Sequence, residues 1–131
     1  MNKRDVSVLI LEDQDKILLQ KRSKTAKRFP LKWGLFGGGV EKGERPETTI
    51  KREILEELSL KLKKIELVHK YNYILSEKNE YGTIFVFKTK YNGETLSLLE
   101  GEAMEWVNIH KCNDFDLHPC YRNILKEVGI I

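Results

Sequence analysis

Residues 37–60 read GGGVEKGERPETTIKREILEELSL, and this stretch predicts a glycine-rich loop followed by a helix. Pro46 lies where the first turn of a helix accepts proline, and the residues after it are mostly good helix formers. At about 100° per residue, Glu53, Glu56 and Glu57 fall on one stripe of that helix, beside an apolar stripe. We therefore expect the three acids at the margin of the buried face.

Carboxylates held this close together repel one another, so the stripe needs a counter-charge. A hard divalent cation such as Mg²⁺ suits an all-oxygen site and can also neutralise a bound diphosphate. The alternative is an ordinary surface helix on which Lys51 and Arg52 pair with the acids. The run Gly37 to Gly39 favours the metal site, because three glycines let the backbone approach a ligand closely.

The rest of the chain indicates a mixed sheet with helices on its faces, and no linker or internal repeat divides it. The expected strands are residues 6–11, 17–21, 33–36, 65–75, 83–91 and 105–109, and the expected helices are residues 46–60 and 119–128. A basic loop is expected at residues 23–32 and a glycine-rich loop at 37–43. With 131 residues, the chain fits a single domain over residues 1–131.

Composition excludes several classes of protein. A net charge of +3 gives no strong nucleic-acid signal. No apolar run is long enough to span a membrane, and residues 6–11 are interpreted as a strand, not as a signal peptide. Cys112 and Cys120 form neither a disulfide framework nor a paired metal motif, so we expect reduced thiols and a cytoplasmic protein. Cations crowd the first quarter and glutamates crowd residues 41–57, which suits a phosphate-bearing substrate or, alternatively, a solvated face.

The central stretch resembles the signature of the Nudix hydrolases, which is Gly, five residues, Glu, seven residues, Arg-Glu, an aliphatic residue, one residue, Glu-Glu, one residue, Gly and an aliphatic residue. The matching positions are Gly38, Glu44, Arg52, Glu53, Ile54, Glu56, Glu57 and Leu60. Ser59 departs from the pattern, where glycine would close the helix at positive φ. The resemblance is tight over residues 33–60 and implies an α/β/α sandwich around a mixed β-sheet.

The resemblance also implies roles for individual residues. The implied catalytic residues are Glu53, Arg52, Glu56 and Glu57, with Glu53 a candidate general base that Arg52 orients. The implied ligands for Mg²⁺, or alternatively Mn²⁺, are the Gly37 carbonyl, Glu53, Glu56, Glu57 and Glu100. Glu100 is the first choice for a later acid upstream of Trp106, and Glu102 is the second.

Substrate contacts are implied for Arg22, Gly38 and Gly39, with Arg22 alternatively a solvated strand-end arginine. Glu44 is expected to brace the loop against the helix. Tyr121 stands near the position where the MutT-like members carry a base-contacting asparagine. His69, His110 and His118 have no ligand spacing between them and are expected to be incidental.

The implied activity is hydrolysis of a small-molecule nucleotide, foremost a nucleoside triphosphate, to the monophosphate and pyrophosphate. Dinucleoside polyphosphates, ADP-ribose and an RNA 5′ end remain open as substrates, and so does a homodimer. A module that binds nucleotides without turnover is another alternative. Residues 18–33 are also similar to isopentenyl diphosphate isomerases, but residues 34–39 lack the cysteine that those enzymes use.

Overall fold

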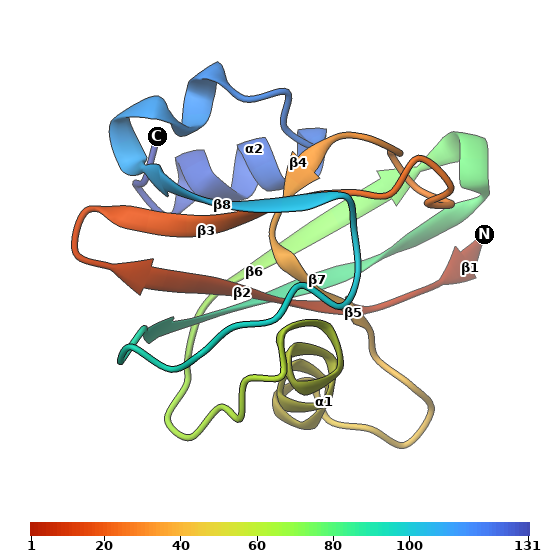
Figure 1. Ribbon diagram of the computed structural model, residues 1–131. Helices are drawn as coiled ribbons and strands as arrows, with labels where there is room; N and C mark the ends of the chain where they lie inside the picture. Colours follow the sequence, from red (N-terminus) through yellow and green to blue (C-terminus); the bar gives the residue numbers. More distant parts are fainter.

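The computed structural model describes all residues from 1 to 131. Its eight-stranded mixed sheet consists of β1 (Asn2–Lys3), β2 (Val6–Asp13), β3 (Lys16–Lys21), β4 (Trp33–Gly34), β5 (Phe36–Gly39), β6 (Glu66–Leu75), β7 (Glu80–Lys90) and β8 (Ala103–Asn108). The helices are α1 (Pro46–Leu58) and α2 (Pro119–Glu127), with short 3₁₀ turns η1 (Ser76–Lys78) and η2 (Ile109–Asp114). Figure 1 shows α1 and α2 on opposite sides of the sheet. The predicted α/β/α sandwich is thus confirmed.

The central strand β2 connects two halves of the sheet. It runs parallel to β7 and antiparallel to β5, while β6 extends the same half beyond β7. β2 pairs with β3 only beside their connecting turn, at Glu12↔Ile17 and Asp13↔Lys16. From there β3 pairs instead with β8 and β4. The two halves therefore separate, and the opening between them lies at the end where β3 finishes and β2 begins.

Each face of the sheet packs against one helix. On the α2 side, Val8 and Ile10 of β2 join Ile124 and Leu125 in the larger core cluster. On the α1 side, Leu9 and Leu11 of β2 belong to a second cluster, with Ile50, Ile54 and Leu58 of the helix. Successive strand side chains point to opposite faces, so a strand covered on both sides reads as a continuous apolar run. This explains the sequence VLIL in β2.

The structure corrects three expectations about local structure. Gly37 to Gly39 form a strand and not a loop, with Gly37 opposite Val8. A Cβ atom at Gly37 would lie 2.0 Å from the Ser7 carbonyl oxygen, so only glycine allows this close pairing. The two-residue strand β1 was not expected, and β7 begins at Glu80 rather than at residue 83. No helix in the structure is long and apolar enough to cross a membrane.

Candidate active site

Three carboxylates converge beside β5. Glu53 and Glu57 come from consecutive turns of α1, and Glu100 comes from the loop that leads into β8. One oxygen from each side chain lies within 4.8 Å of the other two. Backbone contacts hold the loop in place, since the Leu99 amide donates to the Glu57 carbonyl at 2.9 Å and the Gln20 side chain donates to the Glu100 carbonyl at 2.9 Å. The structure thus brings together three of the five predicted metal ligands.

Glu57 is the buried member of this cluster, with only 2% of its surface exposed. Burial, together with the neighbouring carboxyls of Glu53 and Glu100, raises the pKa of Glu57 to about 10. Its Oε2 atom is enclosed and has no hydrogen-bond partner. A buried carboxylate oxygen of this kind needs either a proton or a cation. The donor set, with oxygen atoms only, fits a hard divalent ion.

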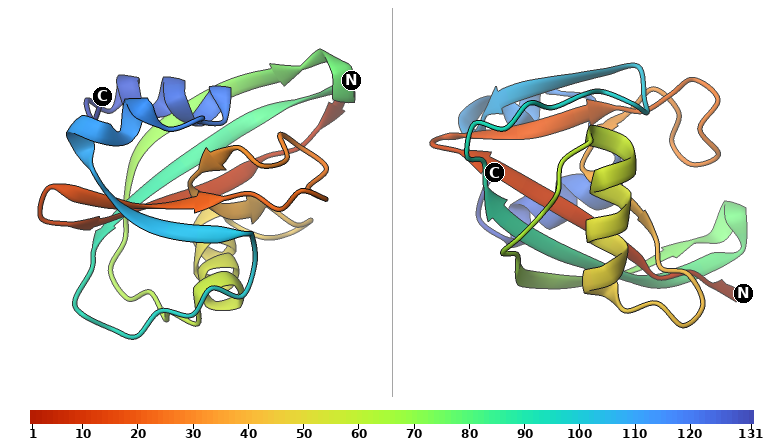
Figure 2. Two further views of the ribbon diagram at one scale, coloured as in Figure 1. Left: turned by 45° about the horizontal axis from the view of Figure 1, so that its top comes forward. Right: turned by 60° about the horizontal axis from the view of Figure 1, so that its bottom comes forward.

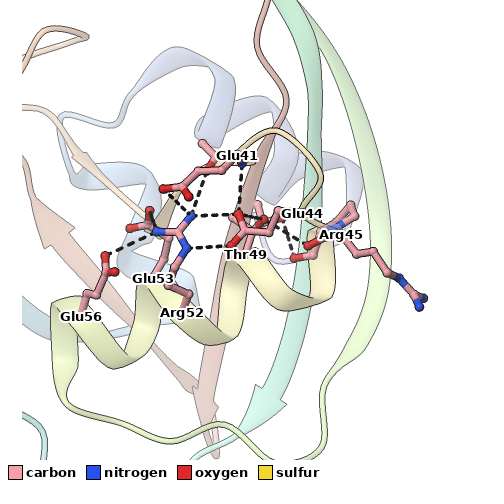
Figure 3. Close-up of polar contacts among 10 residues, drawn as sticks. Glu41, Glu44, Arg45, Thr49, Arg52, Glu53 and Glu56 are labelled. Atoms are coloured by element: carbon pink, nitrogen blue, oxygen red, sulfur yellow. Dashed lines mark hydrogen bonds and ion pairs between the residues drawn. The ribbon is translucent and has the colours of Figure 1, made fainter.

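Arg52 links the acid cluster to the turn before α1, as Figure 3 shows. Its Nη1 donates to Glu53 Oε1 at 2.9 Å, its Nε donates to Glu44 Oε2 at 2.8 Å, and its Nη2 donates to Glu44 Oε1 at 3.0 Å. These hydrogen bonds from Arg52, helped by one from Thr49, lower the pKa of Glu44 to about 2. The ion pairs in turn raise the pKa of Arg52. The expected bracing by Glu44 and the expected Arg52–Glu53 contact are both present.

Glu56 lies apart from the converging carboxylates. Its side chain is 58% exposed and its Oε2 is 3.5 Å from Arg52 Nη1. By contrast, the Glu53 side chain is only 15% exposed. The assignment of Glu56 as a metal ligand stays a prediction, as do the other ligand assignments.

The glycines of β5 allow the acids to sit against the strand. A Cβ atom on Gly38 would lie 2.4 Å from the Glu53 carboxylate, so a side chain there would displace that acid. The Gly39 carbonyl accepts a hydrogen bond from Arg52 Nη2 at 3.3 Å. On its other side, the Arg4 guanidinium lies 3.1 Å from where a Gly39 Cβ would be. The predicted contact of Gly38 and Gly39 with substrate stays a prediction.

A pocket of about 550 Å³ opens beside the acid cluster, in the separation between the two halves of the sheet. Glu53, Glu100 and Gly38 line it, and so do Arg4 and Arg22. Neither arginine forms an ion pair with a carboxylate. Acids and unneutralised cations therefore face the same space, as a metal-bound phosphate substrate requires.

The loop of residues 22–32 closes one side of the pocket. Arg28 donates twice to the buried Glu80, through Nη2 at 2.6 Å and Nε at 3.0 Å, and the Tyr73 hydroxyl donates to Glu80 at 3.1 Å. Arg22 Nε donates to the Arg28 carbonyl at 2.8 Å. The Arg28–Glu80 ion pair therefore also holds the Arg22 side chain in place. In Figures 1 and 2 this loop, the β6–β7 turn and the N-terminus gather at one end of the molecule.

Sequence reasoning missed Arg4, Arg28 and Glu80 as pocket residues. Arg4 precedes β2 in a short run of charged residues, which reads as a solvated terminus. Arg28 and Glu80 are 52 residues apart, and no local spacing connects them. Glu80 begins its strand and is only 6% exposed, so its carboxylate needs a cation nearby. The burial of Glu80 is not visible in the sequence.

Comparison with known proteins agrees with this arrangement. The NUDIX domain family model matches residues 1–128. A nucleoside triphosphatase NudI from Escherichia coli O139:H28 is 28% identical, and the match covers all of both chains. The crystal structure of a MutT NUDIX hydrolase from Burkholderia pseudomallei superimposes with a TM-score of 0.85 at 26% identity, covering 98% of this chain and 100% of that one.

A third relative adds a bound ligand. The NUDIX domain of Shewanella oneidensis NrtR, solved as a complex with ADP ribose, superimposes with a TM-score of 0.75 at 18% identity. That match covers 95% of this chain and 84% of the other, and at this identity it shows a shared fold alone. Since the family model spans nearly the whole chain, the chain belongs to the NUDIX hydrolase family.

Proposed function

We propose that this protein is a divalent-metal-dependent pyrophosphohydrolase that converts a nucleoside triphosphate to the monophosphate and pyrophosphate. The observation that carries the proposal is the convergence of Glu53, Glu57 and Glu100 beside a pocket that is also lined by two arginines without ion pairs. Acids of this kind bind a metal ion, and the arginine side chains of the pocket compensate the charge of the phosphate chain.

Mg²⁺ is the proposed ion, with Mn²⁺ as the alternative. Glu53, Glu57 and Glu100 are the proposed main ligands, and the predicted contributions of Glu56 and the Gly37 carbonyl would complete the set. The enclosed, unpartnered Oε2 of Glu57 supports this assignment, because a cation would satisfy it. When bound, the ion neutralises phosphate charge and activates water for attack on phosphorus.

The protein's own groups position the reactants. Arg52 fixes the Glu53 carboxylate through a charge-assisted hydrogen bond, which suits Glu53 as the proposed general base. Arg22 is proposed to hold a substrate phosphate, since its main chain is tied to Lys32 and its side chain to Arg28. Gly38 leaves room for the Glu53 carboxylate, and Gly38 and Gly39 are proposed to contact the substrate from the pocket wall. A pocket of about 550 Å³ is large enough for a nucleotide.

The relatives support this substrate class over the alternatives. The NudI relative is a nucleoside triphosphatase by name, and its match covers the whole of both chains. ADP-ribose is the second candidate, because the NrtR domain of the same fold binds it. The isomerase alternative has less support. The nearest thiol on the pocket wall, that of Cys120, belongs to α2 and not to the segment after Trp33, and burial raises its pKa.

The test is a product analysis with Mg²⁺ over a panel of nucleoside triphosphates, ADP-ribose and dinucleoside polyphosphates. Release of pyrophosphate together with a monophosphate supports the proposal. Release of orthophosphate with a diphosphate contradicts it, and exclusive cleavage of ADP-ribose selects the second candidate. Thermal stabilisation by a nucleotide without any product identifies a binding module instead.

Matched variants connect the activity to the acids. We expect Glu57→Gln and Glu53→Gln to lower kcat at least about 100-fold, because each removes a charge on which the cation depends. The exposed Glu66, on β6 and away from the pocket, supplies the control variant Glu66→Gln, which should keep full activity. Undiminished activity in both site variants would refute the proposed mechanism.

A further inference from the structure

His118, which the sequence indicated as incidental, begins α2 with a side-chain hydrogen bond. Its Nδ1 accepts from the Cys120 backbone amide at 3.1 Å, which is the usual contact of a residue that caps a helix N-terminus. A ring nitrogen that accepts a hydrogen bond carries no proton. The neutral imidazole therefore carries its hydrogen on Nε2, and this nitrogen is a donor.

The surroundings of His118 keep it neutral and fix its orientation. The Phe29 ring lies 4.2 Å from the imidazole centroid, and the Tyr121 ring stacks on it at 4.3 Å. Burial, together with the nearby charge of Arg22, lowers the pKa of His118 to about 3. The imidazole therefore stays neutral throughout the physiological pH range, with the same nitrogen protonated.

The Nε2 atom is free to meet a ligand. It donates to no protein atom, and unlike the unpartnered Oε2 atoms of Glu47 and Glu57 it is not fully enclosed. Since His118 is otherwise buried and lines the 550 Å³ pocket, this N–H faces the pocket. A role as a metal ligand is excluded in this arrangement, because the lone pair of Nδ1 is used by the helix cap and Nε2 carries a hydrogen.

We propose that the Nε2–H of His118 donates a hydrogen bond to a keto oxygen of the substrate's nucleobase, so that the enzyme prefers keto bases over amino bases. This inference rests on the proposed function and specifies its substrate. The single uncharged donor of His118, beside the Tyr121 ring on the pocket wall, suits a flat, uncharged base, whereas the phosphate chain needs the acids and arginines of the same pocket. An amino group in the same place would oppose donor to donor and leave both unsatisfied.

Two variants separate the substrate contact from the helix cap. In His118→Asn, the amide oxygen can still accept from the Cys120 amide, and asparagine is among the best N-cap residues, but the Nε2 donor is gone. In His118→Gln, the longer side chain keeps a donor near the Nε2 position and loses the cap. His118→Asn keeps the cap but loses the ring packed between Phe29 and Tyr121, whereas His118→Gln loses the cap as well. Both variants should be less stable than the wild type, and His118→Gln should be the less stable of the two.

The experiment compares kcat/KM for the keto and amino partners UTP and CTP, and likewise ITP and ATP. We expect the unmodified enzyme to prefer UTP and ITP. In His118→Asn both preferences should shrink by about five- to tenfold, which is the usual effect of losing one hydrogen bond to a neutral partner. His118→Gln should retain part of the preference. A wild-type preference for CTP and ATP, or ratios unchanged in His118→Asn, would overturn the inference.

A binding measurement separates this inference from the proposed activity. The shift in unfolding midpoint is recorded with the same four nucleotides for the wild type and for His118→Asn. A larger shift with UTP than with CTP that disappears in the variant supports the base contact even if no product is released. Turnover with the same keto-to-amino ratios of kcat/KM in the wild type and in His118→Asn supports the proposed function and rejects the base contact. Absence of both turnover and any shift rejects the two together.

Discussion

Arg52 and Glu44 form a two-point ion pair in which Nε lies 2.8 Å from Oε2 and Nη2 lies 3.0 Å from Oε1. The pair fastens the turn before α1 to the middle of the helix. Because the third nitrogen of the same guanidinium donates to Glu53, the direction of the Glu53 carboxylate depends on this turn. A planar group with several fixed donors is needed to serve two acids at once.

Arg52→Lys tests this dependence. A lysine ammonium is a flexible point charge and cannot reproduce the fork, so Glu53 loses its fixed orientation. We expect kcat to fall about 10- to 100-fold with a smaller change in KM. Arg45→Lys is the matched control on the same segment, because the Arg45 side chain is 82% exposed and pairs only with Glu47, which lies outside the acid cluster. Retention of more than half the activity in Arg52→Lys would mean that the charge alone is sufficient.

The raised pKa of Glu57 predicts how the stability of the metal-free protein depends on pH. An unfolded glutamate ionises near pH 4.3, whereas folded Glu57 keeps its proton up to about pH 10. Between these values the folded state binds one more proton than the unfolded state, so the free energy of unfolding decreases as pH rises. In EDTA, the temperature of the unfolding midpoint should therefore decrease as the pH is raised from 6 to 9.

Glu57→Gln should flatten this pH profile, because glutamine does not titrate, and Mg²⁺ should flatten it in the wild type by taking the place of the proton. The check is a series of thermal unfolding curves at one ionic strength, with Glu66→Gln as the control that keeps the wild-type slope. An equally steep decline in Glu57→Gln would assign the pH dependence to another group.

The positions of the acids also predict an order of metal affinities. Glu57 and Glu100 contribute oxygens to the converging cluster, whereas the Glu56 side chain is largely exposed. In a Mn²⁺ titration followed by calorimetry, we expect Glu57→Gln to weaken binding most, Glu100→Gln by about tenfold, and Glu56→Gln least. Equal losses in Glu56→Gln and Glu57→Gln would show that Glu56 reorients to join the site when the metal binds.

The sequence predicted the parts of the fold that depend on local periodicity. The helix from Pro46 and the placement of Glu53 and Glu57 at the margin of its buried face follow from a 3.6-residue repeat, and the structure has both. The glycine strand was missed because Gly37 to Gly39 carry no alternating pattern. Its pairing depends on how closely β2 can approach, which is a property of the tertiary structure.

The pocket was harder to predict than the acid cluster. Glu100 was found through the family's order of elements, and one of the contacts that place it is a backbone hydrogen bond from Leu99 to Glu57. Backbone pairing of this kind leaves no mark on residue spacing. His118 was set aside because a single histidine without ligand spacing is usually structural, and its free donor became visible only with the Cys120 hydrogen bond.

Ser59, the one departure from the family signature, predicts a gain in stability on substitution. It ends α1 with φ 56° and ψ 28°, the left-handed conformation that costs a side-chain-bearing residue about 1 kcal/mol. Glycine adopts this conformation freely but loses more entropy on folding, so Ser59→Gly should stabilise by about 0.5 kcal/mol, or about 2 °C in unfolding midpoint. Ser59→Ala is the control, because alanine has the same backbone restriction and should bring no gain. The Ser59 amide donates to the Leu55 carbonyl in the present turn, and either replacement keeps that bond. Activity should stay unchanged in both variants, so a loss of kcat in Ser59→Gly would place this turn in the catalytic machinery.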